Sequence, residues 1–331
     1  METKRDLLNH FKLLQKGLTK ADHAEAFLNV TTFTVEVRMG NRVYRLHPLF
    51  NTTVDGKNVY TPQFGPHVTR FGGWRPYFNR PVPDAGRKLL FKELLSKHGL
   101  PTPEYATEAP SALNEVLIKR DISSFGRELR GPFRSAKSVG LKGAEGEFYE
   151  RFIPGEIVKI WFYRAKPVCL EIKPMPTVTG DGRSTIRQLA EKLRFRADNP
   201  SHWQLVEEVL AYFGRKLDDR LPDGERQLID YRYTSAFITP QETRDMRLPA
   251  EGEKGLEVLP SVGEVIWNSL ADVWRADAMY SVDAIRDPQG KLWFLEANFS
   301  PFMHPYLYPA MVRGLGRSAT FQELRFVPAT A

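Results

Sequence analysis

The most constraining feature of the sequence is a pair of apolar segments near the C-terminus, separated by turn-forming residues. Residues 281–285 read Ser-Val-Asp-Ala-Ile, and residues 292–298 read Leu-Trp-Phe-Leu-Glu-Ala-Asn. Asp-Pro-Gln-Gly lies between them at 287–290. Asp, Pro and Gly favour tight turns. The pattern therefore predicts a β-hairpin.

This predicted hairpin carries three polar side chains among apolar neighbours. Glu296 and Asn298 are two residues apart, so they point to the same face of their strand. Strand pairing can bring Asp283 beside them. Carboxylate and amide oxygens suit Mg²⁺, which takes a few such ligands together with phosphate oxygens. A purely structural hairpin is expected to carry apolar residues or Thr there, so we predict a metal site at Asp283, Glu296 and Asn298.

Asp283 followed by Leu-Glu-Ala-Asn-x-Ser-Pro resembles the metal-binding hairpin of the ATP-grasp ligases, among them D-alanine–D-alanine ligases and ribosomal-protein glutamate ligases. The resemblance covers roughly residues 85–309 and implies an α+β ATP-grasp fold, in which two α+β subdomains grip ATP. An N-terminal α/β domain of uncertain topology is expected before it. We expect an N-terminal specificity domain at 1–83, a lid subdomain at 84–150 and a C-terminal subdomain with the metal site at 151–331.

The resemblance also implies a nucleotide site. Lys88 and Lys119 match two family lysines directed at the phosphates, and a lysine is a compact charge with three donors. The alternative for Lys88 is a solvated charge on a helix, and the alternative for Lys119 is an ordinary lysine at the end of a strand. Residues 150–156, Glu-Arg-Phe-Ile-Pro-Gly-Glu, resemble the family's hinge. This similarity assigns Glu150 to the adenine edge, Phe152 and Ile153 to the base, and Glu156 to the ribose, although relatives usually place the ribose acid one residue later.

Two further segments resemble substrate-facing parts of the family. Residues 171–186 resemble the cyanophycin synthetases, with Lys173 where relatives usually have arginine. Arg232 lies in a segment where relatives carry a basic strand, and its forked donors suit a carboxylate or an acyl phosphate. Lys173 and Arg232 are therefore the candidate catalytic residues. Ser281 and Phe302 replace the Arg and Gly of the D-alanine ligases, which argues against a D-alanine substrate.

Composition and missing motifs exclude several classes. A single cysteine, Cys169, excludes an internal disulfide framework and suits the cytoplasm. The charged N-terminus is unlike a secretory signal, and no apolar run is long enough to span a membrane. The sequence lacks a P-loop, a G-x-G-x-x-G turn, kinase HRD and DFG motifs, G-x-S-x-G and a close His pair. The net charge of +7 and the basic segment 119–142 suggest an anionic ligand that carries phosphate.

The resemblance implies an ATP-dependent ligase that forms an amide through an acyl phosphate. It would use ATP and two Mg²⁺ ions, for which Mn²⁺ could substitute. Its partners would be amino acid or peptide substrates, with a peptide or carrier protein as an alternative acceptor; neither a membrane nor nucleic acid is expected, and a homodimer is left open. The rival readings are an ATP-grasp kinase acting on a polyol or sugar phosphate, and an inactive peptide- or RNA-binding module. The sequence names neither substrate.

Local patterns predict the remaining elements. Residues 3–28 are expected to form one or two amphipathic helices, 30–69 strands and 70–83 a connecting loop. Asp84 is expected to cap a helix whose apolar face is Leu89, Leu90, Leu94 and Leu95. Further helices are expected after Ser184 as cap, at 201–213 and at 263–274. Strands are expected at 115–119, 148–153, 158–163 and 167–172.

Overall fold

The computed structural model describes most of the chain. The described residues are 2–18, 24–54, 57–77, 82–84, 86–108, 112–123, 129–141, 146–193, 200–233, 235–237, 244–247 and 255–317. Helices and antiparallel sheets are mixed along the chain, so the predicted α+β class is confirmed. Within these residues, no helix has the length and apolar character needed to cross a membrane.

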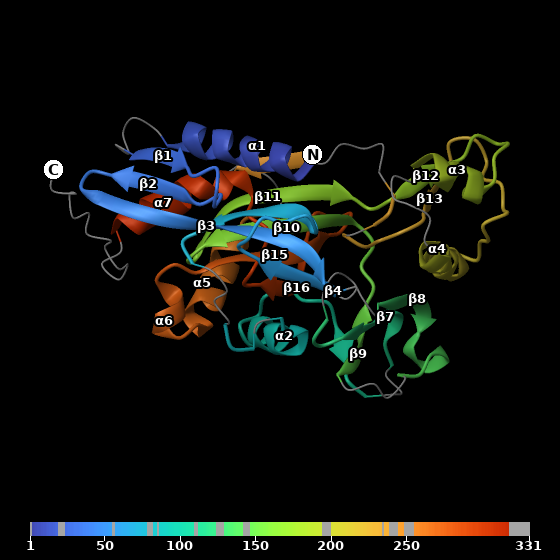
Figure 1. The fold of residues 1–331 in the computed structure, drawn as a ribbon. Helices are drawn as coiled ribbons and strands as arrows, with labels where there is room; N and C mark the ends of the chain where they lie inside the picture. Colours follow the sequence, from blue (N-terminus) through green and yellow to red (C-terminus); the bar gives the residue numbers. More distant parts are fainter. Residues whose placement is uncertain are drawn as a thin grey trace, which may run out of the picture.

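The N-terminal part is one helix on an antiparallel sheet (Figure 1). Helix α1 (Glu2–Gly17) is followed by β1 (Ala24–Leu28), β2 (Val35–Met39), β3 (Arg42–Val54), β4 (Lys57–Thr61) and β5 (Val68–Arg75). The sheet order is β1-β2-β3-β4, with β5 also paired to β3. Its core is continuous with residues near the C-terminus, such as Met303 and Tyr308.

Two predictions for this part are wrong. Residues 24–28 form a strand and do not continue a helix, because they pair with β2 over their whole length. Residues 70–75, expected in a connecting loop, belong to β5 (Val68–Arg75). Glycine and aromatic residues suggested a loop there, but the irregular register of β5 against β3 accommodates them. Gly73 adopts a φ of 98°, which only glycine tolerates easily.

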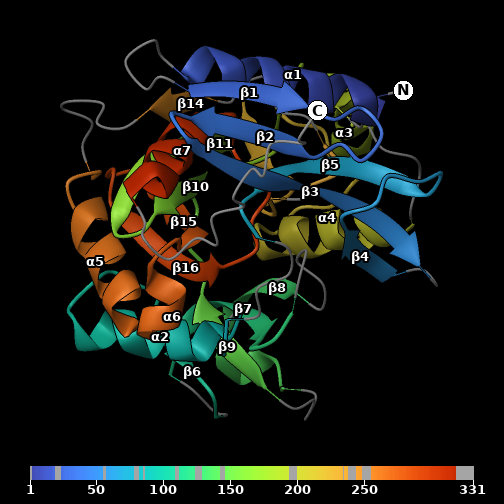
Figure 2. The ribbon, with the colours of Figure 1, turned by 60° about the vertical axis from the view of Figure 1, so that its left-hand side comes forward.

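A central five-stranded antiparallel sheet has the order β14-β11-β10-β15-β16. Its strands are β10 (Glu156–Tyr163), β11 (Lys166–Pro174), β14 (Arg244–Arg247), β15 (Met279–Arg286) and β16 (Leu292–Asn298). The predicted hairpin is confirmed as the pair β15 and β16. One face packs against α2 (Lys88–Lys97) and α5 (Leu259–Ser269) through a core that includes Phe91, Leu95 and Ile266. Figure 2 shows both helices, with α6 (Asp272–Arg275), on the side away from α1.

Two smaller units complete the fold. A four-stranded sheet has the order β6-β9-β7-β8, from β6 (Tyr105–Ala106), β7 (Asn114–Arg120), β8 (Arg130–Ser135) and β9 (Glu147–Arg151), with the 3-10 helix η2 (Ala136–Ser138). A lobe with its own core contains β12 (Thr177–Thr179), α3 (Ile186–Leu193), α4 (Pro200–Tyr212) and β13 (Arg226–Leu228) (Figure 1). The chain ends with η3 (Pro305–Leu307) and α7 (Tyr308–Arg317).

The start of α2 differs from its prediction. Asp84 does not cap the helix: it has a φ of 56°, and the helix begins at Lys88. The carboxylate of Asp121, after the end of β7, instead accepts a hydrogen bond of 2.8 Å from the Leu89 N–H. A residue distant in sequence therefore satisfies one of the free donors that every helix start presents.

The buried face of α2 also differs, since it consists of Lys88, Phe91, Lys92 and Leu95. Leu90 is exposed. Two lysines thus occupy positions on the face that packs against the protein, at the i, i+3, i+4, i+7 spacing of a helix.

Two other helices shift their limits. The cap of α3 is Thr185, which exchanges hydrogen bonds with Gln188 in a reciprocal capping pair. Ser184 instead bonds to Asp181. The helix predicted at 263–274 is two helices, α5 and α6, because the chain leaves the helical conformation at Leu270 and Ala271.

We predict that Gly263→Ala destabilises the protein. Gly263 lies inside α5, and a Cβ atom there would sit 2.0 Å from the backbone oxygen of Ala165. Alanine favours a helix by up to about 1 kcal/mol over glycine, but overpacking against backbone costs about 1–3 kcal/mol. Urea denaturation should therefore show a lower free energy of unfolding.

The control is Gly140→Ala, where an added Cβ meets nothing within 4 Å. Its free energy of unfolding should stay within about 0.5 kcal/mol of wild type. Equal stability of the two variants would contradict the close contact of Gly263 in α5 with the turn between β10 and β11.

Candidate functional site

The candidate site is a row of charged side chains across the central sheet. Strand register places Glu171 opposite Lys159, Lys159 opposite Asp283, and Asp283 opposite Glu296. In antiparallel sheets, directly opposed side chains lie on the same face within contact distance. The row therefore consists of an acid, a base and two further acids, one from each of four neighbouring strands.

A β-bulge at Leu295 makes this row possible. Asp283 pairs with Glu296, while the next residue, Ala284, pairs with Phe294, so Leu295 is the extra residue. Without it, regular alternation would place Glu296 on the face that packs against α2 and α5. Bulges commonly re-aim a side chain beside a functional site. Here the bulge brings Glu296 and Asp283 to one face.

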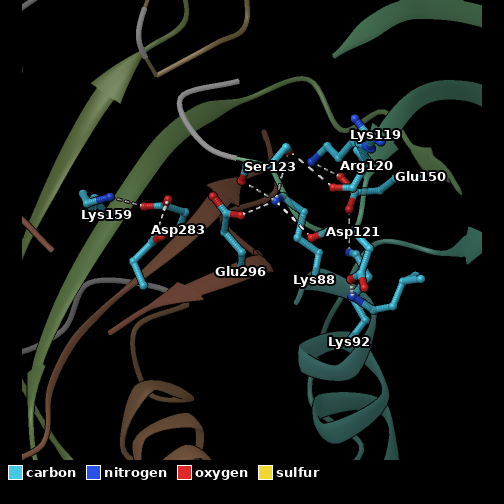
Figure 3. A network of polar contacts seen from close by, with 12 residues as sticks. Lys88, Lys92, Lys119, Arg120, Asp121, Ser123, Glu150, Lys159, Asp283 and Glu296 are labelled. Atoms are coloured by element: carbon cyan, nitrogen blue, oxygen red, sulfur yellow. Dashed lines mark hydrogen bonds and ion pairs between the residues drawn. The ribbon is translucent and has the colours of Figure 1, made fainter. Parts of the chain in front are cut away.

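The carboxylates of the row are held by lysines from two different elements (Figure 3). Lys159 Nζ lies 2.6 Å from Asp283 Oδ1, and Lys88 Nζ lies 3.0 Å from Glu296 Oε2. Asn298 Nδ2 donates to Asp283 Oδ2 at 3.0 Å. The three predicted metal-site residues thus lie together, and their negative charge is balanced by two ammonium groups.

Apolar clusters flank the row along the strands on this face. Toward one end lie Trp161 and Cys169, which join the core of the N-terminal part. Toward the other end lie Ile157 and Ile285, which pack with the hinge residue Phe152. The polar row therefore lies between two apolar regions, where opposite charges interact more strongly than in bulk water.

The donor set fits Mg²⁺ that is bound jointly with a nucleotide. Two carboxylates and an amide are too few for a dedicated protein cage, and the described residues contain no group of three or more His, Cys, Asp or Glu that could hold a metal ion. Mg²⁺ usually takes one or two carboxylates plus phosphate oxygens and water. Beside Asn298, the buried Ser281 hydroxyl has no hydrogen-bond partner among the described residues, which leaves an unused polar group on this face.

Lys88 is positioned by the segment that follows β7. Its ammonium donates to the Ser123 backbone oxygen at 3.0 Å and lies within 3.4 Å of the Asp121 backbone oxygen. Arg87 Nε donates to the Asp121 carboxylate at 3.1 Å. The start of α2 is thereby tied to the four-stranded sheet, with Lys88 between this sheet and Glu296 (Figure 3).

Lys119 is paired with Glu150, and a second lysine shares the same carboxylate. Lys92 Nζ lies 2.6 Å from Glu150 Oε2, and Lys119 contacts the other oxygen. Burial raises the pKa of Glu150, but the charges of Lys119 and Lys92 outweigh it and the net pKa is lowered. Burial lowers the pKa of Lys92 despite the opposing effect of Glu150. Two lysines therefore share one buried carboxylate.

The hinge residues are packed or paired. Phe152 is buried, with ring centroids 5.6 Å from Tyr212 and 5.3 Å from Tyr231. Ile153 packs beside this cluster. Glu156 accepts a hydrogen bond of 2.8 Å from Arg286 Nε, and the two residues face each other across β10 and β15. The roles predicted for these residues in binding adenine and ribose stay predictions.

The two candidate catalytic residues lie near Tyr233. Arg232 donates to both carboxylate oxygens of Asp230 at 2.9 Å, so its fork is already engaged. Lys173 Nζ lies 5.8 Å from the Tyr233 ring centroid and 3.5 Å from its backbone oxygen. The ring of Tyr233 is also 5.0 Å from Lys159 Nζ. Lys173 is thus connected to the row through Tyr233, whereas Arg232 is oriented by Asp230.

The basic segment 119–142 is only partly described. Arg130 pairs with Glu147 at 3.3 Å, and Arg134 lies 3.7 Å from Glu115. Residues 124–128, which contain Arg127, and residue Lys142 lie outside the described residues. The prediction that this segment faces phosphate stays a prediction.

Sequence reasoning missed Lys92 and Lys159 as site residues. Lys92 is completely buried, and its sequence signal is its position four residues after Lys88 on a helix. Lys159 stands between Ile157 and Trp161 in a strand that is apolar on both faces, which is an unusual place for a lysine. Both signals are visible in the sequence, but only pairing across elements gives them meaning.

Comparison with known proteins gives likeness at the level of structure. No family model matches the chain. No curated protein sequence matches it either. The solved structures that it resembles include a bifunctional glutathione synthetase from Pasteurella multocida, with 14% identity, a TM-score of 0.42 and coverage of 89% of this chain and 41% of that one.

Two further structures cover 70% of this chain at 12% identity. The D-alanine–D-alanine ligase from Bacillus anthracis has a TM-score of 0.35, with 62% of its own chain covered. The ATP-grasp ligase PsnB in complex with a minimal precursor has a TM-score of 0.37, with 61% covered. The chain thus spans about two fifths to three fifths of the length of these proteins. Because these TM-scores are below 0.5, the functional proposal rests on the residues of the site and on the sequence motifs.

Proposed function

We propose that the protein is an ATP-dependent ligase that joins a carboxylate to an amine through an acyl phosphate and releases ADP and phosphate. The observation that supports this most is the convergence of Asp283, Glu296 and Asn298 on one face, with Lys88 in contact. The hairpin motif and the hinge motif, which resemble the ATP-grasp ligases, support the same reaction.

The lysine pairs are consistent with a resting state of such a site. Asp283 and Glu296 would hold Mg²⁺ together with Asn298, and the bound ion would neutralise charge on the phosphates. Lys88 reaches Glu296 from the start of α2, so a cation on that carboxylate would free its ammonium for the phosphates. Lys119 is likewise held by Glu150, which Lys92 would continue to balance after Lys119 turned to the nucleotide.

The reaction requires positioning and charge more than covalent help from the protein. The substrate carboxylate attacks the γ-phosphorus of ATP, the bond to the ADP oxygen breaks, and an acyl phosphate forms. An amine then displaces phosphate and loses a proton. Fixed positive charge near the transferred group stabilises the first step. Exclusion of water protects the acyl phosphate, and we assign this role to the 84–150 segment as lid.

The remaining assignments belong to the same proposal. Residues 151–331 would carry the metal site and residues 1–83 the substrate specificity. Lys173 would add charge near the row, and Arg232, held by Asp230, would orient the acyl group. We propose amino acid or peptide substrates and a cytoplasmic protein, the latter from the single cysteine in the sequence.

We predict that Glu296→Gln and Asp283→Asn each lower the rate of ADP formation by about a hundredfold or more, because the charge that binds the cation is lost. ADP release would be measured with Mg²⁺ and ATP, and circular dichroism would check the fold. Asp272→Asn is the control, since its side chain in α6 is 96% exposed. Near-wild-type turnover in either site variant would place the metal elsewhere.

We also predict that Lys119→Ala weakens the binding of ATP more than the binding of AMP. Hydrogen bonds between charged groups contribute about 1.5–3 kcal/mol, so the Kd for ATP should rise roughly ten- to hundredfold while that for AMP changes little. Calorimetry on both nucleotides measures this, with Lys137→Ala, an exposed lysine beside the same sheet, as control. Equal losses for both nucleotides would contradict a phosphate role for Lys119.

Hydroxylamine trapping tests the ligase reaction itself. The protein would be incubated with ATP, Mg²⁺, hydroxylamine and pools of amino acids and short peptides. We expect a hydroxamate to form together with ADP, because hydroxylamine captures an acyl phosphate in place of the amine. Release of ADP with a phosphorylated alcohol, and without hydroxamate or amide, would refute the ligase and favour a kinase.

A further inference from the structure

The N-terminal sheet meets the end of the hairpin at a closely fitted junction. The loop after β16 runs along β5, where the Met303 N–H donates to the Gly72 backbone oxygen at 2.8 Å. A Cβ on Gly72 would approach the Phe302 ring to 2.7 Å, so the loop depends on this glycine. Trp161 of β10 donates to the Phe302 backbone oxygen at 2.7 Å. The site-bearing sheet and the N-terminal sheet therefore share this loop.

Arg75, the last residue of β5, is a buried cation at this junction. It is 3% exposed and donates to the Pro301 backbone oxygen. Its Nε is buried without a hydrogen-bond partner, and no ion pair links it to an acid among the described residues. Burial lowers the pKa of its guanidinium. Buried charges are normally paired, because an isolated charge away from water is costly. An anion supplied from outside the chain would balance it.

Two further cations, Arg70 and Lys159, act on the aromatic side chains of this junction, Phe302 and Tyr60. The guanidinium carbon of Arg70 is 4.7 Å from the centroid of the Phe302 ring, and the exposed Tyr60 ring lies 5.9 Å from the same ring. Burial raises the pKa of Tyr60, whereas Arg75, Lys159 and Arg70 lower it, so all three charges act at its hydroxyl. The junction thus gathers positive charge from two strands, β5 and β10.

The acids near this group already have partners. Asp283 is paired with Lys159 at 2.6 Å. Glu171 accepts a hydrogen bond of 3.2 Å from the Tyr233 hydroxyl. In the proposed function Asp283 would hold Mg²⁺, and the ammonium of Lys159 would then lose this partner. The positive charge at the junction would then increase at the moment when a carboxylate must lie beside the metal.

We propose that this junction binds a carboxylate of the substrate between Arg70, Arg75 and Lys159, with the adjoining apolar or planar group packed on Tyr60 and Phe302. This assignment rests on the proposed ligase function and names its carboxylate site. It gives the N-terminal sheet a direct part in substrate choice. It also places the carboxylate next to Asp283, where phosphoryl transfer would occur, at residues other than Lys173 and Arg232.

The test is fluorine NMR with para-fluorobenzoate as probe and para-fluorobenzamide as its uncharged counterpart, without ATP or Mg²⁺. With the probe at millimolar concentration, the fluorine signal of the benzoate should broaden when the wild-type protein is added. The signal of the benzamide should not. Arg75→Met should weaken benzoate binding by about tenfold or more, because a buried charge is lost. Arg70→Gln should weaken it up to about fivefold, as expected for an exposed charge.

Arg38→Gln is the matched control. The guanidinium carbon of Arg38 lies 4.6 Å from the Phe27 ring centroid on β1 and β2, away from the junction, so it copies the arginine–phenylalanine contact of Arg70. Benzoate binding should not change. If Arg75→Met fails to fold, Arg70→Gln and a Tyr60→Leu variant carry the test, since both residues are exposed.

The outcomes separate this site from the ligase reaction. The carboxylate site would be overturned if the wild-type protein broadened the benzoate signal no more than the benzamide signal. It would also be overturned if Arg70→Gln and Arg75→Met broadened the benzoate signal as much as the wild-type protein does. Benzoate binding with the expected losses, together with failure of hydroxamate formation, would leave the site standing and refute the ligase. Hydroxamate formation without benzoate binding would support the ligase and refute the carboxylate site.

Discussion

The double ion pair at Glu150 is the interaction on which the arrangement of the site depends. Lys92 joins α2 to Glu150 of β9, and Lys119 of the neighbouring strand β7 holds the same carboxylate. Lys92 also donates to Thr102, which in turn bonds to the Phe294 backbone oxygen of β16. Helix α2, the four-stranded sheet and the hairpin are therefore linked through one buried ion pair. Removing a partner from a buried ion pair costs about 3–5 kcal/mol, so this link strongly restricts how the three elements can lie.

Lysines compensate the charge of the two opposed carboxylates of the site. Asp283 and Glu296 are opposed across two strands, where like charges repel. Lys159 and Lys88 relieve that repulsion from a neighbouring strand and from a helix end. In the proposed ligase, a divalent cation on these carboxylates would leave the same two ammonium groups available for other anions.

The loop after Asn298 extends the site to the N-terminal sheet. Its backbone is held by β5, by Arg75 and by Trp161, so the position of the hairpin end depends on residues more than a hundred positions earlier. The cores follow the same pattern, since the N-terminal residues pack with Met303 and Tyr308. The site and the N-terminal sheet are therefore coupled by packing, and a carboxylate bound between them would contact both.

The sequence by itself determined the hairpin, the shared face of Glu296 and Asn298, and the α+β class, because alternation along a strand and turn chemistry are local properties. Only the tertiary structure decided that a bulge at Leu295 turns Glu296 toward Asp283, that Lys88 pairs with Glu296, and that residues 70–75 belong to a strand. Local patterns could not reveal the role of Lys92 either, since a lysine on a helix is usually solvated. Register, bulges and ion pairs depend on partners far away in the chain, and which partner is met follows from packing the whole fold.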